Sequence, residues 1–281
     1  MLRFLKLNPT NWVFMVTLPA ILLVLGLPDV SLGDFALRIS PPNFEFKAKP
    51  GQIIRDTISI ENTDIKRGTY TVRTADWELN DNGGVTMYPA DQPITSTSCR
   101  PWTRIERKTL SLAPNRPKRY RFEVHVPHDA PDGECRFAIV IAPSADNAEA
   151  MSMGSLNVPV VGSIAVIVYV TVGDAAADLS LTEAKRVNMG TKDVVVVRLR
   201  NSGNAHARPF GSLKVRDAKG KSAELLIVPF PVLAGRTWDI QLAVDPRLSG
   251  IESMDALTFP ISLKGLVEWD GGNLKIDTVA Q

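Results

Sequence analysis

One stretch decides the fold of this chain: Ile164-Ala165-Val166-Ile167-Val168-Tyr169-Val170-Thr171-Val172. Every residue in it except Ala165 is β-branched or aromatic, a composition that favours an extended strand. The uncharged segment around it, residues 152–173, also has about the length that a helix needs to span a bilayer. Against a helix stand Asn157, Pro159 and the absence of Lys-rich or Arg-rich flanks. We therefore expect a long strand whose two apolar faces are covered by its own domain or offered to a partner.

The first 33 residues predict a secretion signal. Arg3 and Lys6 form a basic start, residues 13–27 form an apolar core, and Ser31-Leu32-Gly33 is a small-residue cleavage site. An uncleaved membrane anchor is the alternative, but the apolar core is short for a span. We expect residues 1–33 to be removed, which leaves a periplasmic or otherwise exported protein without a membrane span.

The two cysteines, Cys99 and Cys135, predict a structural disulfide, because an exported protein meets an oxidising compartment. The loop that this bridge closes would stabilise the fold by about 3–4 kcal/mol. Two free buried thiols are the alternative. The spacing is not that of a redox CxxC pair, and two thiols without a nearby histidine make a poor metal site, so we expect no bound metal.

The chain that follows the signal shows short alternating runs instead of a sustained helical period. In the clearest run, Tyr120, Phe122 and Val124 alternate with charged residues. Turn signals such as Asn-Gly and Gly-Gly recur between the runs. This texture predicts an all-β protein with two immunoglobulin-like β-sandwich domains in tandem, at residues 34–173 and 174–281.

Three local expectations follow from the same pattern. Pro41-Pro42 should stop or bend the first strand, because proline cannot donate to a ladder. The apolar phase changes between Tyr70 and Trp77, which predicts a one-residue bulge. Residues 144–154 have the composition of a mobile surface loop.

The first domain also carries a recognisable layout. It runs from "ISPPNFEF" (39–46) through "KPGQIIRDTISIENTD" (49–64) and "YTVRTADWELNDNGG" (70–84) to "LSLAPNRPKRYRFEVHVP" (110–127), and then to the valine-rich strand. In this layout the chain resembles the periplasmic pilus-assembly chaperones of the PapD-like superfamily. The resemblance implies two immunoglobulin-like domains and a last strand of the first domain that completes the fold of a pilus subunit.

Strand addition of this kind gives affinity through backbone hydrogen bonds and specificity through alternate side chains. The resemblance therefore makes the long strand the candidate partner-binding element. Its pairing residues would be Ile164, Val166, Val168, Val170 and Val172, of which Val166, Val168 and Val170 would fill alternate pockets of the partner.

The chain departs from the family at the group that anchors the subunit. Those chaperones hold the terminal carboxylate of the subunit with an Arg on the first strand and a Lys on the last. Here the first-strand position falls at Ser40-Pro41 and the last-strand position falls near Ala165, with no Lys between residues 154 and 173. Arg38, which is shifted along the first strand, is the candidate substitute.

No sequence motif points to an enzyme. The three histidines, His125, His128 and His206, lie on a polar strand face, after a proline and in a loop, so we expect solvated or turn histidines. GxSxG, HExxH and Asp-rich metal loops are absent from the sequence. We expect no catalytic residues and no cofactor.

One basic cluster is the remaining candidate site. Arg116, Lys118, Arg119 and Arg121 could create a local field for an anionic polymer or membrane surface. A solvated sheet face that discourages aggregation is the alternative. The formal net charge of the whole chain is only +2, which gives no indication of nucleic-acid binding.

The sequence therefore predicts an exported, non-enzymatic protein that binds subunits of a pilus or surface structure by edge-strand pairing. The alternative is a structural or adhesion module of the cell envelope that binds anionic glycans through the basic cluster. The identity of the partner, the oligomeric state and the role of the second domain are left open by the sequence.

Overall fold

The computed structural model describes residues 36–88, 96–144, 150–153, 156–159, 162–188, 190 and 193–281. The predicted signal segment, residues 1–33, lies outside these ranges. Within them, no helix combines the length and the apolar character that crossing a membrane requires.

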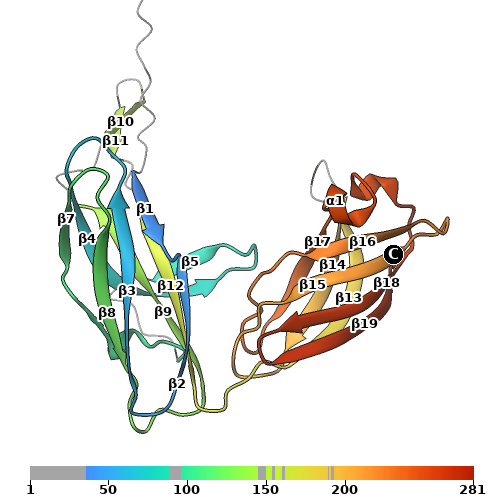
Figure 1. Cartoon of the computed structure of the whole chain (residues 1–281), viewed down its shortest axis with the longest axis horizontal. Helices are drawn as coiled ribbons and strands as arrows, with labels where there is room; N and C mark the ends of the chain where they lie inside the picture. The colour runs from blue at the N-terminus through green and yellow to red at the C-terminus, as the bar shows by residue number, and fades with distance from the viewer. Residues whose placement is uncertain are drawn as a thin grey trace, which may run out of the picture. The chain divides into compact units, whose positions relative to one another are not determined.

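The first sandwich is built from two sheets that face each other across one core (Figure 1). The smaller sheet has the order β1 (Leu37–Ser40), β3 (Ile53–Asn62), β8 (Lys118–His125) and β6 (Thr103–Ile105). The larger sheet has the order β2 (Asn43–Ala48), β12 (Ile164–Val172), β9 (Gly133–Pro143), β4 (Gly68–Leu79) and β5 (Val85–Tyr88), and β7 (Thr109–Leu112) also pairs with β4. A short 3-10 helix, Arg100–Trp102, precedes β6.

The predicted alternation along β8 is confirmed. Tyr120, Phe122 and Val124 are almost fully buried, whereas Arg119 and Arg121 are exposed. Because successive side chains of a strand point to opposite faces, the first set enters the core and the second set faces away from it.

The predicted break at Pro41-Pro42 is also confirmed. Before it, β1 pairs with β3 in the smaller sheet. After it, β2 pairs with β12 in the larger sheet, and this is a parallel pairing. The two prolines therefore mark the place where the chain passes from one sheet to the other, since neither can donate to a ladder.

The predicted bulge in β4 is wrong. The strand keeps a continuous register with β9 from Tyr70 to Ala75. Tyr70 and Val72 point into the core between the sheets, whereas Ala75 and Trp77 belong to a second apolar cluster on the other face. The phase change in the sequence arises because both faces of this strand are covered, each along a different part of its length.

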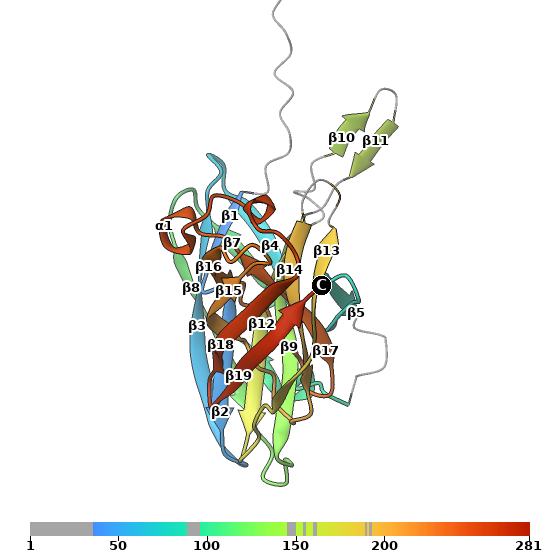
Figure 2. The ribbon, with the colours of Figure 1, turned by 90° about the vertical axis from the view of Figure 1, so that its right-hand side faces the viewer.

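The loop predicted at residues 144–154 is partly wrong, because it contains a strand. Ala150–Met153 (β10) pairs in antiparallel register with Leu156–Pro159 (β11). Among the described residues, this hairpin pairs with no strand of the two sheets, and Figure 2 shows it apart from them.

The second sandwich is one antiparallel sheet of seven strands that folds around a separate core. Its order is β13 (Leu179–Asn188), β14 (Asp193–Asn201), β17 (Thr237–Ala243), β16 (Ser222–Ile227), β15 (Phe210–Arg216), β18 (Ile261–Trp269) and β19 (Gly272–Ala280). The end strands approach each other, since the N–H of Arg186 donates to the carbonyl of Gln281 at 3.3 Å. Two short helices, α1 (Pro246–Ser249) and the 3-10 helix Met254–Ala256, lie between β17 and β18.

The predicted fold class, an all-β chain with two β-sandwiches in tandem, is confirmed. The two apolar cores consist of different residues, from Phe44 to Val172 in one and from Leu179 to Ala280 in the other. The domain boundary at residues 173 and 174 stays a prediction.

The predicted disulfide between Cys99 and Cys135 is present, with 5.4 Å between the Cα atoms. It ties the irregular segment before β6 to the start of β9. The same segment is held to β4 by a buried ion pair, in which Arg100 Nε lies 3.1 Å from Asp76 Oδ2. The hydroxyl of Ser98 donates to the other carboxylate oxygen of Asp76.

Replacing both cysteines by alanine should lower the free energy of unfolding by about 4 kcal/mol, because the bridge closes a loop with a sequence separation of 36 residues. Urea titration of the oxidised protein and of the double variant measures this difference. Equal midpoints for the two proteins would show that the bridge contributes nothing.

Candidate functional site

Strand β12 has two margins, and both are occupied along most of its length. It pairs with β9 in antiparallel register from Ile164 to Val172. It pairs with β2 in parallel register from Ile167 to Val172. Backbone pairing of Val168, Val170 and Val172 with a partner strand, as predicted from the sequence, is therefore wrong, because β2 already fills the margin that the partner would need.

The side chains of the predicted binding set are not available either. Val166, Val168, Val170 and Val172 are at most 1% exposed and belong to the core of the first sandwich. They cannot fill pockets of a partner unless this core opens. The sequence shows that both faces of the strand are apolar, but it cannot show that its valines face inward.

One short part of the strand keeps an open margin. The N–H of Ile167 donates to the carbonyl of Pro42 at 3.3 Å, and the N–H of Gly173 donates to Ala48 at 3.0 Å. Because the backbone groups of an extended strand alternate between its margins, those of Ala165 point to the same side as those of Ile167. Opposite Ala165, β2 has not yet begun, because it starts at Asn43 opposite Ile167, and no other described residue pairs with Ala165 on this side. We call this side of Ile164–Val166 the free margin.

Part of the outer face of the same sheet is apolar. Ala165 and Ile167 lie on it, next to Trp77 and Tyr169. The rings of Trp77 and Tyr169 meet edge to face with 5.5 Å between their centroids, a preferred aromatic geometry. Leu233 of the second sandwich packs against this cluster and covers part of it.

A cleft of about 270 Å³ lies over the uncovered part of this face. Its walls are mainly apolar, with Trp77, Ile167 and Tyr169 on one side and Phe230 and Pro231 on the other. Pro42 and Asn43, where β2 begins, also line it. The free margin and the cleft are therefore neighbours, since Ile167 lines the cleft and Ala165 lies two residues before it.

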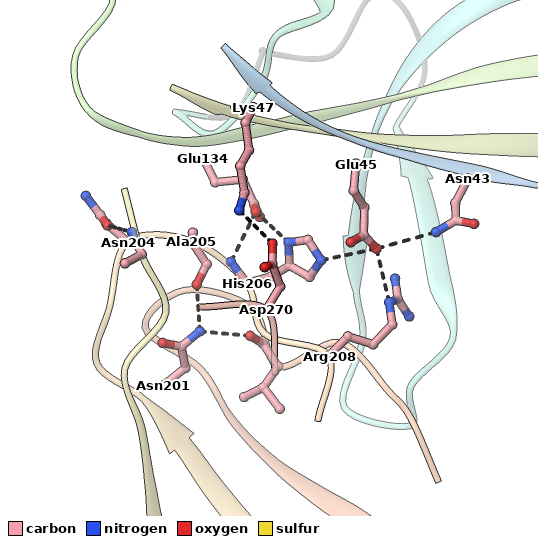
Figure 3. Close-up of polar contacts among 12 residues, drawn as sticks. Asn43, Glu45, Lys47, Glu134, Asn201, Asn204, Ala205, His206, Arg208 and Asp270 are labelled. Carbon is pink, nitrogen blue, oxygen red and sulfur yellow. Dashed lines mark hydrogen bonds and ion pairs between the residues drawn. The ribbon is translucent and has the colours of Figure 1, made fainter. Parts of the chain in front are cut away.

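Next to the cleft, His206 joins the two sandwiches (Figure 3). Its Nδ1 lies within hydrogen-bond distance of Glu134 Oε2, and its Nε2 lies 3.4 Å from Glu45 Oε1. The ring of His206 also stacks on Tyr169, with 4.0 Å between the centroids. These three partners, Glu45, Tyr169 and Glu134, come from β2, β12 and β9, which are consecutive in the larger sheet.

The loop that carries His206 is held in place by Asn201, which is fully buried at the end of β14. Its amide nitrogen donates to the carbonyls of Ala205 and Val232, at 2.8 and 2.9 Å. Its amide oxygen accepts the N–H of Gly203 at 3.0 Å. These bonds fix the loop before His206, so that the ring is presented to the larger sheet in one position.

The junction is charged at neutral pH. Burial alone would lower the pKa of His206, but hydrogen bonds and charges of Glu134 and Glu45 outweigh it and raise this pKa to about 9. The hydrogen bond from His206, with further help from Arg208, lowers the pKa of Glu45 to about 2. The ring therefore carries a positive charge between two carboxylates.

The variant His206→Gln should unfold more easily, because it leaves the carboxylate of Glu134, which is 2% exposed, without its cation. We expect a loss of about 3 kcal/mol at pH 6. The raised pKa makes the contribution of His206 complete below about pH 6.5 and removes it as the pH rises through about 9. Urea titrations at pH 6 and above pH 9 measure both effects.

The control for this prediction is His125→Gln. His125 pairs with Glu123 at 2.8 Å on an open sheet face, where such pairs contribute less than about 1 kcal/mol. If His206→Gln is no more destabilising than His125→Gln at pH 6, or if its cost is the same above pH 9, the charged junction is refuted.

The expectation of a solvated or turn histidine is wrong for His206 and holds for His125, which lies on the polar face of β8. Glu134, the partner of His206, is 72 residues away from it in the sequence, so no local pattern could have indicated the contact. Within the described ranges, no group of three or more His, Cys, Asp and Glu residues could hold a metal ion.

Arg38, the predicted carboxylate anchor, is in the wrong sheet. Its Nη1 lies 2.8 Å from Glu61 Oε2 on the outer face of the smaller sheet. The reason is the crossing at Pro41-Pro42, which separates every residue of β1 from β12. The cation that lines the cleft is Arg208, and its Nε is paired with Glu45 at 3.1 Å.

The predicted polyanion cluster is divided by the fold. Arg119 and Arg121 point outward from β8. Lys118 begins the same strand on the opposite phase, and Arg116 lies in the turn before it. Only two of the four residues therefore share a face.

No family model and no curated protein matches this chain. Among solved structures, the YadV chaperone matches 87% of this chain and 99% of its own at 10% identity, with a TM-score of 0.45. The class 5 fimbriae chaperone CfaA matches 87% and 99% at 11% identity, with a TM-score of 0.44. The E. coli chaperone DraB matches 88% and 97% at 11% identity, with a TM-score of 0.42.

The chain resembles pilus chaperones in fold. This is the resemblance that the layout of the first domain predicts. At such identities and TM-scores the function has to be inferred from the contacts of this chain itself.

Proposed function

We propose that this protein is chaperone-like and binds an extended segment of another exported protein at the free margin of β12. The observation that carries the proposal is the open backbone of Ala165 beside an apolar cleft. A sheet margin with unpaired N–H and C=O groups is a template for another strand. Strand addition satisfies these groups through backbone hydrogen bonds, which need no particular partner sequence.

The geometry limits how the incoming segment lies. It would take the position next to β12 that β2 leaves empty before Asn43, and so continue the larger sheet by a few residues. Its side chains would alternate between the two faces of that sheet. Those on the outer face would meet Pro42 and Ile167 at the cleft, so we expect them to be apolar.

For the class of partner we propose subunits of a pilus or another surface structure. Among similar structures is the SafB chaperone of Salmonella enterica in complex with the pilin SafA, at 13% identity and a TM-score of 0.43. The proposal is supported by the free margin and the cleft of this chain.

Ala165→Pro tests the proposal. Proline removes the N–H that points to the free margin and places its ring where an incoming strand must lie. No backbone bond between described strands should be lost, because Ile164 and Val166 make the bonds to β9. We expect at least a tenfold drop in the recovery of specific partners from periplasmic extract, quantified by mass spectrometry.

The matched control is Ala165→Val, which enlarges the side chain but keeps the N–H. It should recover the same proteins as the unchanged chain. Circular dichroism and thermal unfolding establish that both variants are folded. If folded Ala165→Pro recovers the same proteins in the same amounts, binding does not use the free margin.

A further inference from the structure

The outer face of the smaller sheet has an excess of positive charge. It presents five arginines, Arg38, Arg55, Arg104, Arg119 and Arg121, and three glutamates, Glu61, Glu106 and Glu123. The charge is local, because the whole chain has a formal net charge of only +2. This face belongs to a different sheet from the free margin of β12.

Each of the three glutamates is paired with an arginine. Arg38 lies 2.8 Å from Glu61, and Arg55 lies 2.8 Å from Glu123. Arg107 pairs with Glu106, its neighbour in the sequence. The pairs neutralise the acids of this face, so the excess charge is on the other three arginines.

Two of those three arginines, Arg119 and Arg104, contact neutral groups. Arg119 donates to the hydroxyl of Thr57 at 3.4 Å, and Arg104 donates to the carbonyl of Pro101 at 3.0 Å. The carboxylate next to Arg121 is Glu106, which accepts the backbone N–H of Arg121 at 3.1 Å. Within the described part of the chain, no carboxylate lies in ion-pair distance of the guanidinium groups of Arg104, Arg119 or Arg121.

Hydroxyl groups lie beside the two exposed arginines of β8. The register places Ser59 opposite Arg119 and Thr57 opposite Arg121. Ser40 lies opposite Ser59 on the next strand. The face therefore combines guanidinium groups, which bind sulfate and phosphate through paired hydrogen bonds, with hydroxyls that can donate to or accept from a sugar.

We propose that this face binds an anionic polysaccharide, whose charged groups are held by Arg119 and Arg121 and whose hydroxyls meet Ser59 and Thr57. Charge complementarity supports this occupant, since Arg119 and Arg121, whose guanidinium groups have no carboxylate in ion-pair distance, lie beside hydroxyls that a sugar can bond. An open sheet face also suits a polymer that lies across several strands better than a small ligand, which needs a concave site. The inference does not depend on the proposed strand binding.

The experiment measures the binding of the full exported chain to heparin as a probe at about 0.1 M salt, where surface charges are only partly screened. Arg119→Ser with Arg121→Ser should weaken this binding roughly tenfold or more, because two charge-assisted contacts are lost. Arg116→Ser with Lys118→Ser is the matched control, since it removes the same charge from residues outside this face. The control should change the affinity less than about twofold.

Three results would overturn the inference. One is an equal loss for the two double variants, which would mean that only net charge matters. Another is the absence of heparin binding by the unchanged chain. The third is binding to phosphatidylglycerol-containing vesicles without binding to heparin, which would identify a lipid surface as the ligand. Arg116, Arg119 and Arg121 are exposed and Lys118 is half-buried, and thermal unfolding verifies that both variants are folded.

Discussion

The parallel pairing of β2 with β12 is the constraint on which the rest of the structure depends. It exists because the chain leaves the smaller sheet at Pro41-Pro42 and enters the larger one at Asn43. The pairing makes β12 an interior strand from Ile167 onward and directs Val168 and Val170 into the core. The pairing begins only at Ile167 and does not include Ala165. The strand that closes most of this margin therefore also sets the limit of the short part that stays open.

The position of β2 also makes possible the charged junction at His206. Glu45 on β2 and Glu134 on β9 flank β12, and both accept from the ring of His206. A buried cation between two carboxylates depends strongly on its partners, because removal of one leaves an uncompensated charge. The junction therefore couples the strands that form the free margin to the loop 201–208 of the second sandwich, which also supplies Arg208 to the cleft.

Much of the fold could be predicted from the sequence, because local patterns carry it. The alternation in β8, the prolines before β2 and the two cysteines each indicate a structure through neighbouring residues or through a compartment rule. The site could not be predicted in the same way. Which margin of β12 is filled depends on a strand more than 100 residues earlier in the chain. The acidic partners of His206 are also remote, since the nearer one, Glu134, is 72 residues away. The sequence predicts a bulge in β4 and a partner surface on β12, because it shows that both faces of these strands are apolar but not that the chain itself covers them.

Residue-resolved hydrogen exchange of the isolated protein tests the central claim most directly. The amides of Ile167, Tyr169 and Thr171 point to β2 and should exchange slowly, since each is bonded inside the sheet. The amide of Ala165 points the same way, before the start of β2, and should exchange at least a hundredfold faster than that of Ile167. Equal protection of Ala165 and Ile167 in the absence of any partner would contradict the account, because the margin would then be closed along its whole length.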